Sequence, residues 1–272
     1  MTYPSEVDSN STSQPRHGLD FSLLQHYLNE VGVDNAQVFV HSQVASTNDV
    51  IRTYVPHLGN VDVIAVAADE QTAGRGRLDR TWVSSFGLGI ALSIAVSETK
   101  VAVPLSTVPL VSGLAVHRAL QRCGLEIGLK WPNDLVVVDA EGELRKLGGI
   151  LVQRFDDCLV IGIGINLDHD QEQLPIPQAT SARLLGYEIE HELLIAYLLN
   201  EVNILFQSDT SWHADYRAHC ISIGAQVQVQ RVNSLPIEGV VEDVDASGHL
   251  LLRSGPDLIC VESGDVQHLK RL

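Results

Sequence analysis

The stretch from residue 69 to residue 82, DEQTAGRGRLDRTW, constrains the fold more than any other part of this chain. It joins an apolar run at 63–68 to a second apolar run at 88–96, and each run predicts a β-strand. The stretch is therefore a long connection between two strands of a compact domain. Long connections of this kind more often carry function than not, so we expect a functional loop here.

The residues of this loop are suited to binding an anion. Gly74 and Gly76 allow the backbone to approach a ligand closely, and Trp82 offers a flat surface for a planar ring. Arginine supplies a permanent, forked cation that matches carboxylate and phosphate groups. The arginines of the loop are Arg75, Arg77 and Arg80. Taken alone, GRGR favours a solvated surface loop, so the functional interpretation depends on other motifs.

Composition narrows the classes of function. The chain has 272 residues, of which 45% are hydrophobic and 19% charged, enough for one large domain and a small one. Its formal net charge of −16 makes duplex DNA or RNA a poor partner, because nucleic acid binding needs a basic face. A basic loop within an acidic protein indicates a small anionic ligand, and no nucleic acid partner is expected.

The cysteines and histidines favour neither a disulfide framework nor a metal site. The four cysteines are far apart and form no C-x-x-C pair, so we expect buried thiols in a reducing compartment. The eleven histidines are scattered without metal-ligand spacing. No apolar run is long enough to span a membrane and no secretory signal is evident, so a cytoplasmic protein is expected. The cysteines are Cys123, Cys158, Cys220 and Cys260.

Hydrophobic periodicity predicts a domain that mixes helices and strands. Residues 1–17 are polar and are expected to form a disordered tail, after which Asp20 caps a first helix. Ser46 is expected to cap a helix that runs to about His57. Further helices are predicted at 104–123, 192–206 and 212–220, and a loop at 168–180. Strands are predicted at 38–44, 63–68, 88–96, 127–131, 135–138, 147–154 and 159–165.

The pattern changes after residue 220. Short apolar runs alternate with glycine-containing turns, which predicts a small all-β barrel of four or five strands. We therefore predict an α/β (α+β) domain at 18–220, followed by a separate β domain at 221–272.

Four further motifs lie in the predicted α/β domain, and each has an ordinary structural explanation. The Ser-Thr-Asn segment at 46–48 reads as a helix cap, and KWPND at 130–134 as a turn. The paired glycines of KLGGIL at 146–151 are compatible with a bulge. GIGIN at 162–166 lacks the third glycine and the helix of a dinucleotide-binding fingerprint. Each explanation is adequate alone, but together the motifs favour a common site.

Activation of a carboxylic acid by ATP needs the groups that these motifs supply. The acid attacks the α-phosphorus, and charge then builds on phosphoryl oxygens before pyrophosphate leaves. Catalysis is mainly positioning and charge stabilisation by several cations and backbone amides, usually with Mg²⁺. The available groups are Arg75, Arg77, Lys130 and Lys146, with side-chain amides at Asn133 and Asn166.

Taken in order, the motifs resemble those of the biotin protein ligases over roughly residues 40–272. They are STN at 46–48, QTAGRGR at 71–77, Trp82, KWPND at 130–134, KLGGIL at 146–151 and GIGIN at 162–166. The resemblance implies a mixed sheet like that of class II aminoacyl-tRNA synthetases, followed by an SH3-like barrel. It also implies synthesis of biotinyl-5′-AMP from biotin and ATP with Mg²⁺. The biotin would then pass to one lysine of a biotin carboxyl carrier protein or domain.

The resemblance assigns roles to individual residues. Lys146, Arg75 and Arg77 would be catalytic, with Lys146 between the biotin carboxylate and the α-phosphate. The biotin-binding set would be Ser46, Thr47, Asn48, Gln71, Arg75, Gly76, Arg77, Lys146 and Gly149. The ATP and adenylate set would be Gly74, Arg75, Arg77, Trp82, Lys130, Asn133, Lys146 and Asn166. Lys270 matches a basic position in the family's barrel and is expected to reach the nucleotide.

Two departures from the family pattern bear on these expectations. Asp79 stands where the family loop commonly has a glycine, and it is expected either to stiffen the loop or to pair with Arg80. Some members carry an N-terminal DNA-binding winged helix, but the segment before Ser46 contains Arg16 as its sole Lys or Arg. We therefore expect no repressor activity. A monomer and a homodimer both remain open.

Two other functions stay under consideration. A lipoate–protein ligase would use the same chemistry on another acid, but the KWPND and GRGR motifs are of the biotin type. A non-catalytic module that only binds a cofactor or carrier would not need so many cations directed at phosphate. Turnover of ATP with each acid distinguishes these functions.

Overall fold

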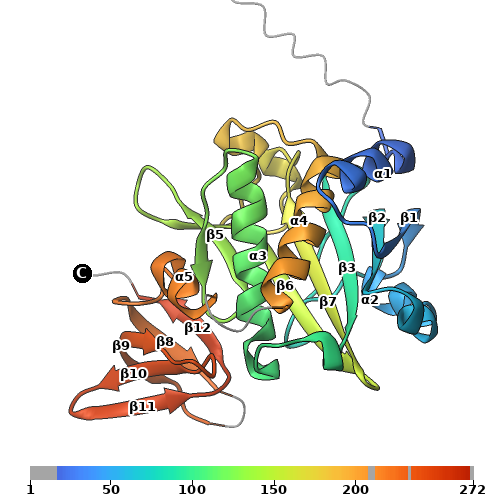
Figure 1. The fold of residues 1–272 in the computed structure, drawn as a ribbon. Helices are drawn as coiled ribbons and strands as arrows, with labels where there is room; N and C mark the ends of the chain where they lie inside the picture. The colour runs from blue at the N-terminus through green and yellow to red at the C-terminus, as the bar shows by residue number, and fades with distance from the viewer. Residues whose placement is uncertain (1–16, 208–211, 232–233, 270–272) are drawn as a thin grey trace, which may run out of the picture.

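The computed structural model describes residues 17–207, 212–231 and 234–269. A seven-stranded sheet with the order β1-β2-β3-β7-β6-β5-β4 forms the larger part of the molecule (Figure 1). Its strands β1 and β2 are parallel and all other neighbours are antiparallel, so the sheet is mixed. The strands are β1 (Ala36–Val44), β2 (Val63–Gln71), β3 (Gly89–Ser97), β4 (Gly128–Lys130), β5 (Asp134–Val138), β6 (Leu144–Phe155) and β7 (Cys158–Asn166).

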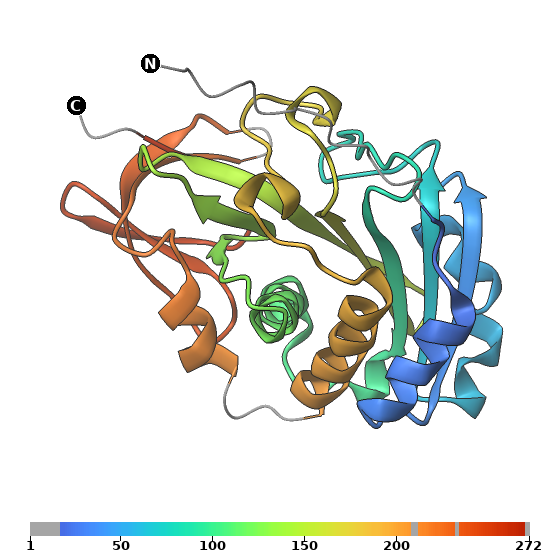
Figure 2. The same ribbon diagram turned by 90° about the horizontal axis from the view of Figure 1, so that it is seen from above.

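Three helices cover one face of this sheet (Figure 2): α1 (Phe21–Glu30), α3 (Val108–Arg122) and α4 (His191–Phe206). The side chain of Asp20 caps α1 through the backbone amides of Ser22 and Leu23, as the sequence predicts. Isoleucines 161, 163 and 165 of β7 belong to the core shared with α3 and α4. Because successive side chains of a strand point to opposite faces, the intervening Gly162 and Gly164 face the other side of the sheet.

The predicted helix from Ser46 to His57 is wrong. The segment forms three short turns, α2 (Thr47–Val50), η1 (Ile51–Thr53) and η2 (Val55–Asn60). Pro56 stands in the first turn of η2 and has no backbone N–H to donate to a preceding turn, so one continuous helix cannot run through to His57. The remaining 3-10 turns are η3 (Glu98–Lys100), η4 (Leu105–Thr107), η5 (Gln171–Gln173) and η6 (Arg183–Leu185).

The C-terminal part is an antiparallel sheet with the order β11-β10-β9-β8-β12. The predicted short strands are therefore present, five of them in the part of the chain that the structure describes. Strands β11 and β12 are the two edge strands of this order. Among the described residues they do not pair with each other, so the sheet is open and is not a closed barrel. The strands are β8 (Gln226–Gln230), β9 (Ile237–Val244), β10 (Leu250–Ser254), β11 (Asp257–Val261) and β12 (Asp265–His268).

The two sheets are joined by hydrogen bonds from the larger unit to the turn between β9 and β10. The indole Nε1 of Trp131 donates to the carbonyl of Gly248 at 2.9 Å, and the hydroxyl of Ser106 donates to the carbonyl of Ser247 at 2.8 Å. Helix α5 (Trp212–His219) lies beside the same junction (Figure 1). The C-terminal sheet is therefore fixed next to the segment that carries the KWPND motif.

None of the helices in the described ranges is long and apolar enough to cross a membrane. All four cysteines are free, but the expectation that all are buried is wrong. Cys158 and Cys220 are buried, Cys123 is half-buried, and Cys260 is exposed on β11. The predicted tail at 1–17 lies almost entirely outside the described residues.

Candidate active site

The predicted site residues come together around one pocket of about 1200 Å³. The pocket extends along the sheet from β3 to β4, and the C-terminal strand β12 closes one side. Gly162 and Gly164 line it, which places it on the face opposite α3 and α4. The predicted residues in its lining are Ser46, Thr47, Asn48, Gln71, Arg75, Gly76, Arg77, Trp82, Lys130, Asn133, Lys146, Gly149 and Asn166.

Gly74 is the predicted residue that does not line the pocket. It is buried behind the lining, where a Cβ would lie 2.4 Å from the carbonyl oxygen of Trp82. The Trp82 amide donates to the Gly74 carbonyl at 2.9 Å. The absence of a side chain at Gly74 therefore allows the loop to close on itself.

One end of the pocket is a buried polar cluster. Gln71 Oε1 accepts hydrogen bonds from the backbone amide and the hydroxyl of Thr47, at 2.8 and 3.1 Å. The Asn48 side chain donates to Gln153 Oε1 at 2.9 Å, and its own oxygen accepts from Ser93 Oγ at 2.6 Å. Ser46, Thr47 and Asn48 are each less than 5% exposed. These bonds fix the amide and hydroxyl groups before a ligand arrives.

The sequence pattern gave the wrong local role for Ser46. Its side chain caps no helix in the structure, although Ser46 occupies the N-cap position of α2. Instead, Ser46 faces the pocket beside Thr47 and Asn48. A helix of four residues has little need of a cap, so the polar segment at the strand-to-helix turn is better explained by the pocket.

Two glycines of β7 make room for two pocket side chains. A Cβ on Gly164 would lie 2.4 Å from Cε2 of Trp82, so the indole rests directly on the strand backbone. A Cβ on Gly162 would lie 2.4 Å from Oδ1 of Asn48. Real Cβ atoms do not approach other atoms this closely. The glycines of the GIGIN motif therefore leave the space that the side chains of Trp82 and Asn48 occupy. The sequence pattern singled out the motif but not this purpose.

The glycine–arginine loop folds as a tight hairpin over the pocket. The Gly76 amide donates to the carbonyl of Arg80 at 2.7 Å, and the backbones of Arg75 and Thr81 pair as an isolated antiparallel β-bridge. Leu78 and Asp79, at the tip, have φ angles of +54° and +57°. Asp79 therefore occupies a backbone conformation that glycine adopts more easily, which explains the glycine expected at this position.

The loop arginines contact different parts of the molecule. Arg75 pairs with Asp49 of α2 at 2.5 Å, while Arg80 pairs with Asp265 of β12 rather than with Asp79. Arg77 donates to Asn133 Oδ1 at 3.0 Å and to the carbonyl of Gly264 at 3.1 Å. Burial lowers the pKa of Arg77, although it remains a cation at neutral pH. Both sheets therefore hold the loop.

Asp134 lies between the two pocket lysines. Its carboxylate accepts from Lys146 at 2.5 Å and from Lys130 at 3.2 Å. Burial alone would raise the pKa of Asp134, but the two lysines outweigh it and hold the pKa below its usual value. Asp134 belongs to the KWPND motif, yet the sequence did not identify it as a site residue. Its placement required the pairing of β5 with β6.

The remaining predicted residues are held by the strands around Lys146. The side-chain ammonium of Lys146 lies over Gly149, where an added Cβ would be 3.5 Å from its Nζ. Asn133 donates to the carbonyl of Ile150 at 2.8 Å, and Asn166 to that of Thr180 at 3.0 Å. These bonds orient both amides at the pocket wall. Lys270 lies outside the described residues.

All of β12 lines the pocket, and the sequence indicated none of it; two of its residues carry ionisable groups. Asp265 reaches it beside Arg80, and His268 lies near Lys130. Burial, followed by the positive charge of Lys130, lowers the pKa of His268 to about 4. Nothing in the local sequence marks either residue, because only the docking of the two sheets brings β12 to the pocket.

The geometry of the pocket defines a class of protein. A buried set of amides and hydroxyls at one end can bind a polar, uncharged group. Cations at the other end, over β4 to β6, can bind carboxylate and phosphate together. A planar indole lies between them on β7. This is the site of an enzyme that activates a small acid with a nucleotide.

Comparison with known proteins identifies the family. Residues 40–168 match the model of the biotin/lipoate A/B protein ligase family. The biotin–[acetyl-CoA-carboxylase] ligase of Mycobacterium tuberculosis is 32% identical over 265 residues, which cover 94% of this chain and 97% of that protein. The chain belongs to the biotin protein ligase family and is a ligase.

Solved structures share the fold. The biotin protein ligase of Aquifex aeolicus in complex with biotin and ATP has a TM-score of 0.72 and 24% identity, covering 86% of this chain and 99% of that one. The biotin protein ligase of Leishmania major in complex with biotinyl-5-AMP has a TM-score of 0.59 and 25% identity, covering 86% and 99%. The predicted mixed α/β fold and the predicted family are thus confirmed.

Proposed function

We propose that the chain joins biotin to ATP in the pocket and then transfers the biotin to a carrier protein. In the first step a biotin carboxylate oxygen bonds to the α-phosphorus, and the bond to pyrophosphate breaks. The product is biotinyl-5′-AMP. In the second step the amine of a carrier lysine attacks the acyl carbon, loses a proton and releases AMP. The observation that carries this proposal is one pocket with a buried polar end and a cationic end.

The buried polar cluster is the proposed site of the biotin head group. The ureido group of biotin is flat, uncharged, and both donates and accepts hydrogen bonds. Thr47, Asn48 and Gln71 offer fixed donors and acceptors at the pocket end where these side chains are already ordered. Ser46 lies in the same wall. Such preorganisation reduces the entropy that binding must overcome.

The cationic groups are proposed to bring the carboxylate and the phosphates together. Arg75, Gly76 and Arg77 would bind the biotin carboxylate and the phosphate, and Lys130 would add a further charge. Lys146 would bridge the carboxylate and the α-phosphate and stabilise the charge that develops during attack. Gly149 would leave space for Lys146. Trp82 would pack against the adenylate, with Asn133 and Asn166 beside the nucleotide and Gly74 holding the loop.

The donor set of the pocket fits Mg²⁺ that arrives with ATP. Asp134 and Asp265 are carboxylates in the lining, and Mg²⁺ binds one or two carboxylates together with phosphate oxygens. When bound, the ion would neutralise charge on the phosphates. Asp134 is the better placed of the two, because it lies between the lysines proposed to meet the phosphates.

The rest of the molecule is proposed to serve the second step. Residues 18–220 would be the catalytic domain and 221–272 an SH3-like domain, and the antiparallel order of the five C-terminal strands supports this. The partner would be a biotin carboxyl carrier protein or domain, met in the cytoplasm. Since the chain has a net charge of −16, we propose no repressor function. Operator-specific binding in a gel shift at physiological salt would contradict that statement.

The proposal is tested by pyrophosphate release from ATP, with biotin or lipoate supplied separately and no carrier present. Release with biotin alone is expected. Release with lipoate alone would make the chain a lipoate ligase, and release with neither, including no initial burst, would indicate a protein that only binds its ligands. Mass spectrometry of a carrier domain, before and after incubation, then tests the transfer step.

Lysine substitutions provide the matched control. Lys146→Ala is expected to abolish most release while lowering thermal stability only slightly, because its ion pair with Asp134 is partly solvated. Lys100→Ala removes a lysine that pairs with Asp62 outside the pocket, and it should leave release unchanged. Equal activities of the two variants would refute the role proposed for Lys146.

A further inference from the structure

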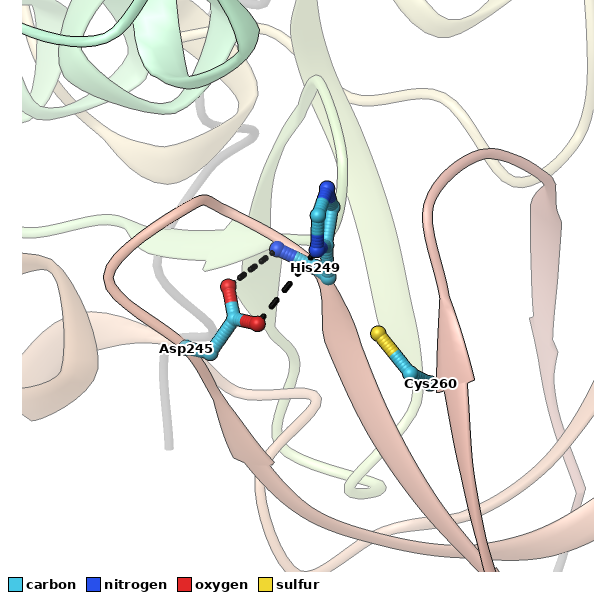
Figure 3. Close-up of side chains that lie close together, drawn as sticks. All are labelled: Asp245, His249 and Cys260. Carbon is cyan, nitrogen blue, oxygen red and sulfur yellow. Dashed lines mark hydrogen bonds and ion pairs between the residues drawn. The ribbon is translucent and has the colours of Figure 1, made fainter.

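A second group of potential ligand atoms lies on the C-terminal sheet. Asp245, His249 and Cys260 each place one nitrogen, oxygen or sulfur atom within 4.8 Å of the atoms of the other two (Figure 3). None of the three lines the pocket. The biotin and ATP chemistry therefore gives them no role.

The turn between β9 and β10 positions the carboxylate and the imidazole. Asp245 Oδ1 accepts the backbone amides of Ser247 and His249, at 2.8 and 2.9 Å, which holds the turn closed. Its other oxygen, Oδ2, faces Nδ1 of His249 at 3.3 Å. Gly248, with a φ of +83°, supplies the conformation that this tight turn requires. One oxygen thus forms the turn, and the other is directed at the imidazole.

Strand pairing adds the thiol. Cys260 of β11 is directly opposite Leu251 of β10, and His249 precedes Leu251 by two residues. Side chains two residues apart along a strand share a face, so the imidazole and the thiol are diagonal neighbours on the outer face. The opposite face carries Leu250 and Leu252, which are fully buried. The thiol is therefore open to ions in solution.

The spacing agrees with that around a tetrahedral metal ion. Zinc binds oxygen and nitrogen at about 2.0–2.1 Å, so a tetrahedral ion holds two such ligand atoms about 3.3 Å apart. The separation of Oδ2 and Nδ1 is 3.3 Å. A sulfur at about 2.3 Å from zinc would lie about 3.5 Å from the other two atoms. Since all three ligand atoms lie within 4.8 Å, the exposed Cys260 side chain needs to move by little more than about 1 Å.

We propose that Asp245, His249 and Cys260 form a binding site for a divalent transition-metal ion of the zinc class. A thiolate, an imidazole and a carboxylate are the mixed donors that zinc accepts, whereas Mg²⁺ and Ca²⁺ prefer oxygen alone. Three protein ligands leave the fourth position to water. The sequence spacing does not reveal the site, because β10 must pair with β11 before the thiol reaches the turn.

The charges around the thiol are compatible with a cation. The carboxylates of Asp245 and Glu262 both act on the Cys260 thiol, and they would attract a divalent ion to it.

The site also has a structural consequence. The carbonyl of Gly248 accepts the indole Nε1 of Trp131, which directly precedes the pocket segment Pro132–Asp134. An ion held between Asp245 and His249 would brace the turn that receives this indole. The ion would therefore stabilise the docking of the C-terminal sheet on the larger unit.

Titration with Co²⁺ tests the site directly. The full chain is treated with a chelator, freed of nucleotide and biotin, and titrated with Co²⁺, whose bond to a thiolate produces a charge-transfer absorption. The wild type should show this absorption, and Zn²⁺ should abolish it by displacement. Zn²⁺ should also raise the midpoint of thermal unfolding.

Three variants decide the outcome. Cys260→Ser should lose the absorption, and His249→Gln should weaken Co²⁺ binding by more than about tenfold, since even groups that only support metal ligands contribute that much. Cys123→Ser removes a thiol elsewhere and should behave as wild type. All three should release pyrophosphate normally in metal-free buffer apart from Mg²⁺. Absence of the absorption in wild type, or its persistence in Cys260→Ser, would overturn the proposal, while the ligase activity stands on its own test.

Discussion

Replacing Gly164 with alanine should displace the Trp82 indole and slow biotin activation while the protein stays folded. The new Cβ would lie 2.4 Å from Cε2 and 2.7 Å from Nε1 of Trp82. Favourable carbon–carbon contact begins at about 3.5 Å, so the ring must retreat by about 1 Å. Overpacking of this kind destabilises by about 1–3 kcal/mol. Alanine gives the unfolded chain less conformational freedom than glycine does, which offsets about 0.4–1 kcal/mol of this cost. The free energy of unfolding should therefore fall by about 1–2 kcal/mol.

The effect on activity should be larger than the effect on stability. A displacement of about 1 Å in a positioning group can lower the rate by about 100-fold. The assay is kcat/KM for biotin in pyrophosphate release, measured beside thermal unfolding. Gly59→Ala is the matched control, because a Cβ there meets nothing within 4 Å. In the Gly164→Ala protein, Trp82→Leu should restore the melting temperature by making room, without restoring activity.

Three results would refute this reasoning. Wild-type kcat/KM in Gly164→Ala would mean that the indole position is unimportant for catalysis. Failure of Trp82→Leu to recover any stability would mean that the clash lies elsewhere than at the indole. A loss of activity shared equally by Gly59→Ala would show that the assay reports glycine content in general, and not this contact.

Three further predictions concern the pocket walls and the loop. His268 has a pKa lowered to about 4, so the unfolded chain binds more protons at this residue between pH 4 and 6.5. The free energy of unfolding should fall by about 1–2 kcal/mol as pH drops through that window, after allowance for partial exposure, and His268→Gln should flatten this change in urea unfolding. Asp79→Gly should raise stability by up to about 1 kcal/mol, since φ is +57°, and an unchanged or lower melting temperature would contradict this. Biotin with ATP should slow hydrogen exchange of residues 73–82, and Arg80→Ala should speed exchange in the free protein by breaking the pair with Asp265; identical exchange in all samples would count against ordering of the loop by its anions.

Much of the fold could be predicted because local patterns agree with it. The buried strand β2 is apolar along most of its length, and the helix after Asp20 has both its cap and its periodicity in the sequence. The turns η1 and η2 were missed because apolar periodicity continues across Pro56 while the backbone does not. Local sequence describes single elements well but describes breaks between short turns poorly.

The lining of the pocket could be predicted largely as a list of residues, but the contacts between those residues could not. The motifs lie on segments that line the pocket, so motif recognition was sufficient to bring Lys146 and Arg77 to the same pocket, while their roles stay a prediction. Asp134 and Asp265 were missed because their importance depends on which cation each one meets. Those pairs form only when β5 joins β6 and when β12 docks beside the loop. Partners that depend on tertiary structure leave no local signal.

Ion pairs within this acidic protein hold the cations that line the pocket. Although the chain has a net charge of −16, these pocket cations pair with particular carboxylates. Asp49 holds Arg75, and Asp134 holds both pocket lysines. The cations are thus positioned before ligands arrive, and phosphate or carboxylate can replace one oxygen partner by another.

Arg77 differs from the other pocket cations, because among the described residues its side-chain hydrogen bonds do not go to a carboxylate. Its hydrogen bonds in the described structure go to neutral oxygens of Asn133 and Gly264. Burial lowers the pKa of Arg77, because its surroundings stabilise the positive charge of the guanidinium less than water would. An anion in the pocket would compensate the charge of Arg77 at the point where the loop, the KWPND turn and the C-terminal sheet meet.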